Sequence, residues 1–263
     1  MNILVLGGNG YLGSKILKQL VLRNSNVFST IREYSDLSRL NDIKDNINFV
    51  NAKYQDIDNM LSDVRIDCIV NMVCDYGRRA NIDMIYSNLM FPLEVLELAA
   101  KHKVNKFITV GTALPVDLNL YSFSKNSFSE YGRFYTEKNG LNFIDLKVQM
   151  YYGSDEPQDR FIPSTISKMI RGDVVNTTYG TQLRDIIAVD DVVNLIIGVI
   201  DREFSGFNSI DIGTGIAPSI SELIDFIWEK TEKKSIVNKG AVPMRLNEPD
   251  CIADRSEVLR ILN

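Results

Sequence analysis

The sequence contains a single histidine, His102, and three cysteines among its 263 residues. A Ser-His-Asp hydrolase needs a histidine beside its nucleophile. His102 instead stands in a Lys-His-Lys run at an expected helix end, where a solvated position explains it. Cys68, Cys74 and Cys251 are odd in number and show no Cys-x-x-Cys spacing. We therefore expect buried free thiols rather than a disulfide framework, and no metal site.

The sequence also lacks long apolar runs and long blocks of like charge. No apolar stretch approaches the roughly 18 residues that a transmembrane helix needs, and the N-terminus enters an expected strand at Asn2 without a charged leader. The net charge is −5, which excludes the basic face of a nucleic-acid binder or a polybasic membrane reader. We expect a cytoplasmic protein that binds neither nucleic acid nor membrane and holds any anionic ligand with isolated arginines.

A glycine-rich turn follows the first apolar run. Ile3–Leu6 has the composition of a parallel strand buried on both faces, and apolar residues recur at helical spacing from Ile16 onward. Strand, glycine turn and helix in this order are the context of a dinucleotide fingerprint, in which the backbone approaches a pyrophosphate at a helix N-terminus. The spacing is Gly-x-x-Gly-x-x-Gly, and a simple tight turn is the alternative. The expected cofactor contacts are Gly7, Gly10, Tyr11, Leu12 and Gly13.

The expected second strand, Val27–Ile31, ends without the acidic residue that would bond an adenine ribose 2′-hydroxyl and select NAD. Arg32 follows it, and a guanidinium can receive a 2′-phosphate in a fork geometry. A solvated surface arginine beside Glu33 is the alternative. We predict that Arg32 contacts the cofactor and that NADP(H) is preferred, with NAD(H) possible.

Strand and helix patterns alternate over more than half of the chain, which predicts an α/β fold with a doubly wound parallel (Rossmann) sheet. After Tyr151, prolines and glycines interrupt shorter segments, which indicates a smaller C-terminal substrate-binding lobe. We place the dinucleotide-binding domain at 1–147 plus about 185–204, and the lobe at about 148–184 and 205–263.

The loop after the expected strand Cys68–Val73 lies beyond a strand C-terminus, where ligands collect in open α/β sheets. Val73 is therefore an expected cofactor contact, and Tyr76 and Arg78 are expected substrate contacts. Simple packing of Tyr76 and solvation of Arg78 are the alternatives.

The stretch Thr112–Lys125 carries the candidate catalytic groups. Tyr121 and Lys125 are four residues apart, so they share one face of a helix, and a nearby ammonium favours the tyrosine phenolate. We expect Lys125 to lower the pKa of Tyr121, which makes Tyr121 a usable proton donor near neutrality. Thr112 offers a hydroxyl at the end of the preceding strand. Any helix can carry Tyr-x-x-x-Lys by chance, so its weight comes from agreement with the rest of the chain.

These motifs, taken in order, resemble those of the extended short-chain dehydrogenase/reductases over nearly the whole chain. The glycine turn and the Thr-Tyr-Lys trio match that family's cofactor turn and catalytic residues. The other resembling features are, in chain order, Asn88, Tyr152-Gly153, Arg184-Asp185, Val189-Asp190-Asp191, Ile212-Gly213-Thr214-Gly215 and Arg245.

The resemblance implies roles for individual side chains. Thr112, Tyr121 and Lys125 become the catalytic trio, with Tyr121 and Lys125 also contacting the cofactor. The implied substrate contacts are Asn88, Thr112, Arg184 and Arg245, and the two arginines face a diphosphate. Asp190 and Asp191 sit at the start of a helix and are not needed as an acid/base pair.

Within the family, three segments look most like CDP-paratose and CDP-abequose synthases: Asp75-Tyr76-Gly77-Arg78, Gly111–Pro115 and Arg245-Leu246-Asn247-Glu248. This resemblance implies NADPH-dependent reduction of the 4-keto group of a nucleotide-activated 4-keto-6-deoxy or dideoxyhexose, in deoxysugar biosynthesis for surface polysaccharide. A nucleotide-sugar 4-epimerase with tightly held NAD is the alternative, and a non-catalytic NADP-binding regulator is a second. Met150 departs from the Asn or His usual in sugar-nucleotide enzymes.

Two expected helices are apolar on more than one side. In the first, at 81–102, the residues off the main stripe are Ile82, Phe91, Val95 and Leu98. In the second, at 121–138, they are Phe123, Phe128, Tyr131, Phe134 and Tyr135. One sheet face cannot cover both helices on all these sides. Members of the resembling family pair these helices across a two-fold axis, which implies a homodimer. Coverage by the C-terminal lobe is the alternative.

Overall fold

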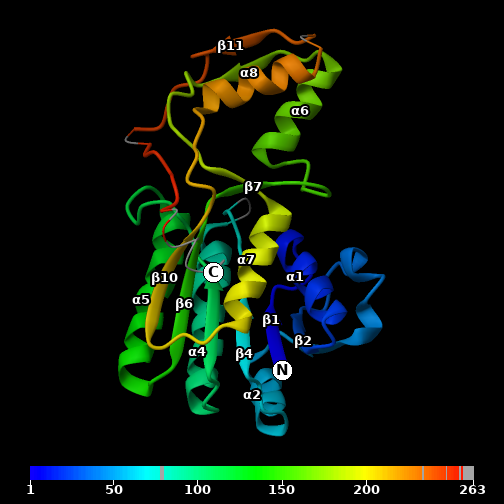
Figure 1. Cartoon of the computed structure of the whole chain (residues 1–263), viewed down its shortest axis with the longest axis vertical. Helices are drawn as coiled ribbons and strands as arrows, with labels where there is room; N and C mark the ends of the chain where they lie inside the picture. Colours follow the sequence, from blue (N-terminus) through cyan, green and yellow to red (C-terminus); the bar gives the residue numbers. More distant parts are fainter. Residues whose placement is uncertain (78–79, 233, 247, 255, 257–263) are drawn as a thin grey trace.

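A seven-stranded parallel sheet forms the centre of the computed structural model, which describes residues 1–77, 80–232, 234–246, 248–254 and 256 (Figure 1). From edge to edge its strands are β10 (Phe207–Ile212), β6 (Asn142–Val148), β5 (Lys106–Val110), β4 (Cys68–Asn71), β1 (Asn2–Leu6), β2 (Asn26–Ile31) and β3 (Ile47–Asn51). The strand order reverses at β1, so a topological switch point lies between β1 and β4. The expected doubly wound Rossmann sheet is confirmed.

Helices cover both faces of this sheet because its strands are apolar on both faces. One face packs against α1 (Tyr11–Leu22) and α7 (Val189–Asp201). The other packs against α2 (Tyr54–Asp63), α4 (Phe91–Lys101) and α5 (Leu120–Asn139). Two short 3₁₀ helices, η1 (Ser38–Leu40) and η2 (Lys44–Asn46), connect β2 to β3. In the described part of the chain, no helix combines the length and the apolar character needed to cross a membrane.

The helix before β5 changes its winding along its length. It begins as α3 (Asn81–Ile85), passes through a π-helical segment, η3 (Tyr86–Met90), and continues as α4. Pro92 stands just after this segment and has no N–H to donate to the carbonyl of Asn88, which removes one α-helical hydrogen bond there. The wider turn carries Asn88 toward the C-terminal end of the sheet, beside the loop that follows β4.

A smaller group of elements lies beyond the C-terminal ends of the strands (Figure 1). It contains α6 (Phe161–Arg171), α8 (Ile220–Lys230) and two strand pairs. The pairs are β8 (Val175–Thr177) with β11 (Val237–Lys239), and β7 (Met150–Tyr152) with β9 (Ile186–Ala188). Helices α6 and α8 bury their own apolar cluster, which includes Met169, Ile220 and Ile224.

One part of the expected domain division is wrong. Residues 207–212 were assigned to the lobe, but they form β10, which extends the main sheet in parallel with β6. The physical reason is that Phe207 stacks on Phe143 and that Ile210 and Ile212 are buried in the core beside α7. The local pattern of Ile210–Ile212 predicts a strand, but it does not show which sheet that strand joins.

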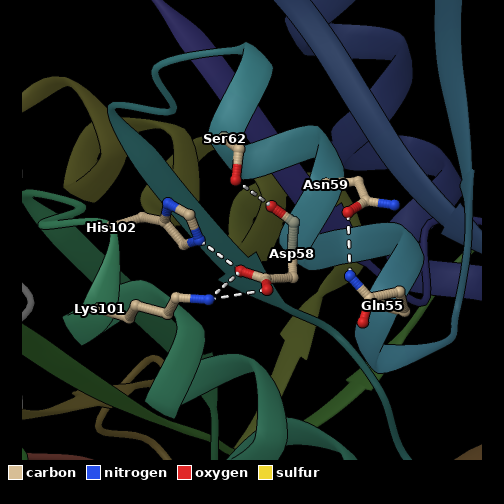
Figure 2. Close-up of polar contacts among 6 residues, drawn as sticks. All are labelled: Gln55, Asp58, Asn59, Ser62, Lys101 and His102. Carbon is tan, nitrogen blue, oxygen red and sulfur yellow. Dashed lines mark hydrogen bonds and ion pairs between the residues drawn. The ribbon is translucent and has the colours of Figure 1, made fainter.

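The surroundings of His102 also differ from the expectation. It does end a helix, as the C-cap residue of α4, but its side chain is 16% exposed rather than solvated. Its Nε2 lies 2.6 Å from Oδ1 of Asp58 in α2, and Lys101 Nζ lies 2.7 Å from Asp58 Oδ2 (Figure 2). His102 and Lys101 together lower the pKa of the Asp58 carboxyl. Asp58 therefore ties α2 to the end of α4, at the opposite end of the strands from the glycine turn.

Candidate active site

The glycine turn joins β1 to α1 and adopts the conformation that a close ligand approach requires. Gly7 has φ +74°, a region that side chains disfavour. A Cβ on Gly13 would lie 2.4 Å from the Gly7 carbonyl oxygen, so only glycine lets α1 pack this closely on the turn. Gly10 is the N-cap of α1 and supplies no side chain to cap it. The first turn of α1 therefore presents backbone N–H groups and the positive end of the helix dipole.

Two cavities meet at this turn. The first, of about 620 Å³, runs over the ends of β1 and β2 and is lined by Gly7, Asn9, Arg32, Ser35 and Val73, among others. The second, of about 400 Å³, lies over the ends of β5 and β6 and is lined by Gly10, Tyr11, Leu12, Gly13 and the trio. Cys74 and Tyr76 line both. An elongated dinucleotide can thus span the turn from one cavity to the other, and the residues present fit such a group.

Arg32 lies at the exposed end of the first cavity. Its backbone N–H donates to Ser35 Oγ at 2.9 Å, which folds the chain into a small turn after β2. Arg32 and Ser35 both line the cavity, and β2 itself contains no Asp or Glu side chain. The end of β2 therefore presents a guanidinium and no carboxylate to this cavity.

The candidate catalytic trio converges on the second cavity, which Thr112, Tyr121 and Lys125 all line. Thr112 follows β5 and is 7% exposed, while Tyr121 and Lys125 stand in the first turns of α5. Asn119 and Ser122 fix the start of α5 by a reciprocal capping box, which sets the direction of the Tyr121 side chain. Lys125 Nζ donates to the Val73 carbonyl oxygen at 3.1 Å, so helix α5 is tied to the loop after β4.

The electrostatics of Tyr121 differ from the expectation. Burial raises its pKa well above the ordinary value, and the neighbouring Cys74 and Tyr76 raise it further. The expected lowering by Lys125 is therefore not what this arrangement produces, because the Lys125 ammonium points to the Val73 carbonyl. Burial lowers the pKa of Lys125 itself, while Cys74 and Asp145 oppose that shift. Tyr121 accordingly holds its proton in this structure.

Aromatic and sulfur groups surround the Tyr121 hydroxyl. The Tyr76 ring stacks on the Tyr121 ring with centroids 5.1 Å apart, and Tyr76 is 50% exposed at the cavity mouth. Cys74 Sγ lies 3.8 Å from the Tyr121 hydroxyl oxygen. All three cysteines are free, as expected, but Cys74 is exposed rather than buried because it follows β4 at the open edge of the sheet.

Comparison with known proteins identifies the family of this chain. The model of the NAD dependent epimerase/dehydratase family matches residues 3–213. The chain belongs to that family. Among curated relatives, CDP-abequose synthase of Salmonella muenchen is 28% identical over 257 residues, covering 94% of this chain and 86% of the relative. A putative UDP-glucose 4-epimerase of Methanocaldococcus jannaschii is 26% identical, covering 86% of this chain and 81% of the relative.

Solved structures show the same fold. UDP-glucuronic acid 4-epimerase from Bacillus cereus, in complex with UDP-glucuronic acid and NAD, superposes with a TM-score of 0.86 at 21% identity. The match covers 100% of this chain and 93% of that structure. UDP-glucose 4-epimerase from Thermotoga maritima has a TM-score of 0.82 at 22% identity, over 97% of this chain and 90% of that structure. The family model thus shows the family, and these solved structures show the fold.

Asn88 is buried and bonds to the loop after β4. It is 1% exposed, and its side-chain oxygen accepts a hydrogen bond from the Asp75 N–H at 2.8 Å. Its amide nitrogen donates to the Asp75 carbonyl at 2.7 Å and to Ser124 Oγ at 3.4 Å. Asn88 lines neither cavity, and its buried amide holds the loop after β4 in place.

The three expected substrate arginines have different surroundings. Arg184 lines the second cavity, but its guanidinium is held by Glu248 Oε1 at 2.6 Å and by the Pro249 carbonyl at 2.6 Å. Arg245 is exposed and does not line either of the two cavities described above. Arg78 lies outside the described residues. If Arg184 binds a diphosphate, its guanidinium must contact the phosphate while it also pairs with Glu248.

Arg160 is a cavity residue that the sequence interpretation missed. It precedes α6, lines the second cavity, and lies with its guanidinium 4.2 Å from the Tyr151 ring centroid. Its Nε is 3.2 Å from Glu156 Oε1, and burial raises the pKa of that carboxyl while Arg160 opposes the shift. The available signal was a basic residue just before a helix on the lobe side of an acidic protein, which is too common a pattern to identify a site.

Proposed function

We propose that the protein reduces the 4-keto group of a nucleotide-activated 4-keto-6-deoxy or dideoxyhexose, with NADPH as the preferred cofactor. The main observation behind this proposal is that Thr112, Tyr121 and Lys125 all line the second cavity, which meets the first cavity, with Arg32, at the glycine turn. The similarity to CDP-abequose synthases over most of the chain supports the same class of substrate and a place in deoxysugar biosynthesis. We propose the cytoplasm as its location, in keeping with its free cysteines.

Each residue of the trio has a role in this reaction. NADPH supplies the hydride, and the chain supplies orientation and protons. Thr112 donates a hydrogen bond to the substrate carbonyl oxygen, and Tyr121 gives that oxygen its proton as the alcohol forms. Lys125 holds the nicotinamide ribose and offsets negative charge left on Tyr121. Arg160 and Arg184 line the second cavity and are the candidate binding groups for the diphosphate, because guanidinium forks suit phosphate oxygens. Arg245, the other arginine expected to bind it, lies outside this cavity.

One observation favours a reductase over a 4-epimerase. Arg32 stands where an acidic residue would select NAD. The 4-epimerase stays the second candidate because similar solved structures are epimerases. A non-catalytic regulator is less well supported, since it would not require the complete trio around one cavity.

A substrate panel tests this proposal. The purified protein is incubated with NADPH and, separately, with CDP-, dTDP-, UDP- and GDP-linked 4-keto-6-deoxy sugars, and the loss of NADPH absorbance is followed. Turnover of at least one member is expected. Interconversion of 4-hydroxy sugar nucleotides without added cofactor, together with no NADPH loss across the panel, would instead establish the epimerase.

Cofactor preference gives a more local prediction. We expect kcat/KM to be higher with NADPH than with NADH, and Arg32→Ala to reduce that preference by about tenfold, since loss of one charge-assisted hydrogen bond costs roughly 1.5 kcal/mol. Arg23→Ala is the matched control, because Arg23 is exposed at the end of α1 and pairs with Asp201. Equal use of both cofactors by the unaltered protein, or NAD that co-purifies with it, would contradict the preference.

We also propose a homodimer through α5 and the helix of α3, η3 and α4. Apolar side chains remain exposed along both: Ile82, Tyr86 and Met90 on the first, and Phe123, Tyr131 and Phe134 on α5. A groove of about 700 Å³ lies beside them, lined by Val116, Tyr131 and Phe134 among others. Phe91, Val95, Leu98 and Phe128, which had been expected to contribute, are buried against the sheet within one chain. The exposed apolar surface is thus smaller than expected.

Light scattering at micromolar concentration checks the assembly. The expected mass is about twice the 29.8 kDa of one chain, and Phe134→Lys is expected to shift it toward the monomer. Phe226→Lys is the control, since Phe226 on α8 is similarly exposed, at 58% against 53%. A monomeric mass for the unaltered protein would show that these side chains face solvent.

A further inference from the structure

Asp185 is a fully buried carboxylate that stands next to Arg184, directly before β9. It is 0% exposed, and its two oxygens accept hydrogen bonds from neutral groups of two distant segments. The donors are the N–H groups of Thr214, Gly215 and Ala253, at 2.9, 2.7 and 3.2 Å, and the Thr214 hydroxyl, at 2.7 Å. Hydrogen bonds to a charged acceptor are about twice as strong as those between neutral groups. Asp185 therefore fixes both segments that carry these donors.

The protein is tightly packed around this carboxylate. A Cβ on Gly213 would lie 2.5 Å from Asp185 Oδ2, 2.6 Å from the Ala253 Cβ and 2.8 Å from Gln149 Cγ. Gly213 directly follows β10, and Gln149 stands between β6 and β7. The carboxylate thus lies where the C-terminal edge of the main sheet meets the smaller group of elements, and it cannot shift without moving the backbone.

The first segment fixed by the carboxylate, residues 248–253, also holds the guanidinium of Arg184. Arg184 Nη2 donates to Glu248 Oε1 at 2.6 Å. Between this ion pair and the N–H group bound to the carboxylate, the Cys251 carbonyl accepts a hydrogen bond from the Asp185 N–H at 2.8 Å. The segment is therefore fastened to Asp185 by both its backbone and its side chain, and it carries the acidic partner of Arg184.

The second segment, the loop between β10 and α8, supports the backbone of Arg184. Thr214 and Gly215 belong to this loop, and the Pro218 carbonyl in the same loop accepts a hydrogen bond from the Arg184 N–H at 3.0 Å. Arg184 is 8% exposed, and it lines the second cavity. Both segments that Asp185 binds thus determine where the Arg184 side chain lies in the cavity wall.

We infer that Asp185 is a positioning residue for Arg184, whose guanidinium it keeps in place by holding the two segments around it. This role rests on the proposed function, in which Arg184 binds the diphosphate of a nucleotide sugar. Binding of phosphate by a guanidinium depends on geometry, because the planar fork must meet two oxygens at once. Asp185 lines neither cavity, so it acts on the diphosphate only through Arg184. Its loss is therefore expected to affect the diphosphate and to spare the cofactor.

Amide hydrogen exchange without added ligand tests the contacts of Asp185. In Asp185→Asn the amide has one acceptor oxygen, and its NH₂ group faces the N–H donors. The N–H groups of Thr214, Gly215 and Ala253 are expected to exchange at least about tenfold faster in this variant, while those of β5 keep their rates. Asp190→Asn is the matched control, since it removes the charge of an exposed carboxylate in the first turn of α7. Unchanged exchange at all three sites would overturn the inference.

Binding measurements separate positioning from simple support of the fold. The affinities for CDP, UDP, dTDP and GDP are measured by calorimetry, and that for NADPH by fluorescence, so no turnover is needed. Asp185→Asn is expected to weaken the tightest of the four nucleoside diphosphates by about tenfold and NADPH by less than threefold. Equal losses for both kinds of ligand, or no loss for either, would overturn the positioning role. Failure of the unaltered protein to bind any of the four would overturn it as well.

Thr214→Val is a milder variant, which keeps the carboxylate and removes only the hydroxyl donor. It is expected to weaken the same nucleoside diphosphate by about two- to fivefold and to leave NADPH affinity unchanged. If Asp185→Asn does not fold, unaltered nucleoside diphosphate affinity in Thr214→Val would overturn the role. Weakened nucleoside diphosphate binding in these variants, with no turnover of any 4-keto sugar by the unaltered protein, would instead retain the role of Asp185 and reject the proposed reaction.

Discussion

Tyr121→Phe is expected to lower turnover by about 10²–10⁴, the usual contribution of a positioned proton donor. Tyr121 lines the second cavity beside Thr112, and its hydroxyl is the group placed to give a proton to a substrate oxygen. Phenylalanine keeps the ring that stacks on Tyr76, so packing at the cavity mouth is preserved. Steady-state kinetics with the best member of the substrate panel provide the measurement.

The control for this substitution is Tyr131→Phe. Tyr131 stands on the same helix, α5, but it is 44% exposed in the groove away from the trio, so its loss of a hydroxyl should leave turnover unchanged. NADPH affinity should remain within about threefold in both variants, since neither change alters the glycine turn. Turnover of Tyr121→Phe within threefold of the unaltered enzyme would remove Tyr121 from the mechanism.

Local pattern was sufficient to predict the elements that build the site. The strand Ile3–Leu6 and the turn Gly7–Gly13 could be identified because apolar period and glycine spacing are properties of neighbouring residues. The position of Tyr121 and Lys125 on one helix face followed from their spacing alone. The second cavity brings these segments together because parallel strands place all their C-terminal ends at one edge of the sheet.

What could not be predicted depends on contacts between distant segments. Asn88 was expected to face a substrate, but its amide is taken by the backbone of Asp75, which lies 13 residues away. The pKa of Tyr121 was expected to fall because Lys125 is near in sequence, yet burial and the loop residue Cys74 decide its direction. β10 joins the main sheet through stacking of Phe207 on Phe143, a contact that no local period reveals.

Asp145 illustrates a signal that was present but not interpreted. It interrupts the apolar run Phe143–Leu146, where a carboxyl inside a buried parallel strand is costly unless it is paired. The sequence therefore marks a buried carboxyl on β6, but it does not show which group bonds to it. The structure shows that Ser129 of α5 donates a hydrogen bond to this carboxyl.

The second prediction with a large expected effect concerns the glycine turn. Gly13→Ala is expected to weaken NADPH binding by about 10- to 100-fold, because the added methyl must push against backbone and overpacking of this kind costs roughly 1–3 kcal/mol. The new Cβ would lie 2.4 Å from the Gly7 carbonyl oxygen and 2.9 Å from Gly8 Cα, and neither is the end of a flexible side chain. Helix α1 must therefore move away from the turn, which carries its N-terminal N–H groups away from the pyrophosphate position.

Ser14→Ala is the matched control for this change. Ser14 is the next residue of α1, it is 4% exposed, and its hydroxyl donates to the Tyr11 carbonyl within the same helix. The alanine there adds no volume, so NADPH affinity measured by fluorescence titration should change less than threefold. Circular dichroism of Gly13→Ala separates loss of binding from loss of fold, because the seven-stranded sheet should persist while α1 shifts locally. A folded Gly13→Ala protein that binds NADPH as tightly as the unaltered chain would show that the pyrophosphate does not rest on this turn.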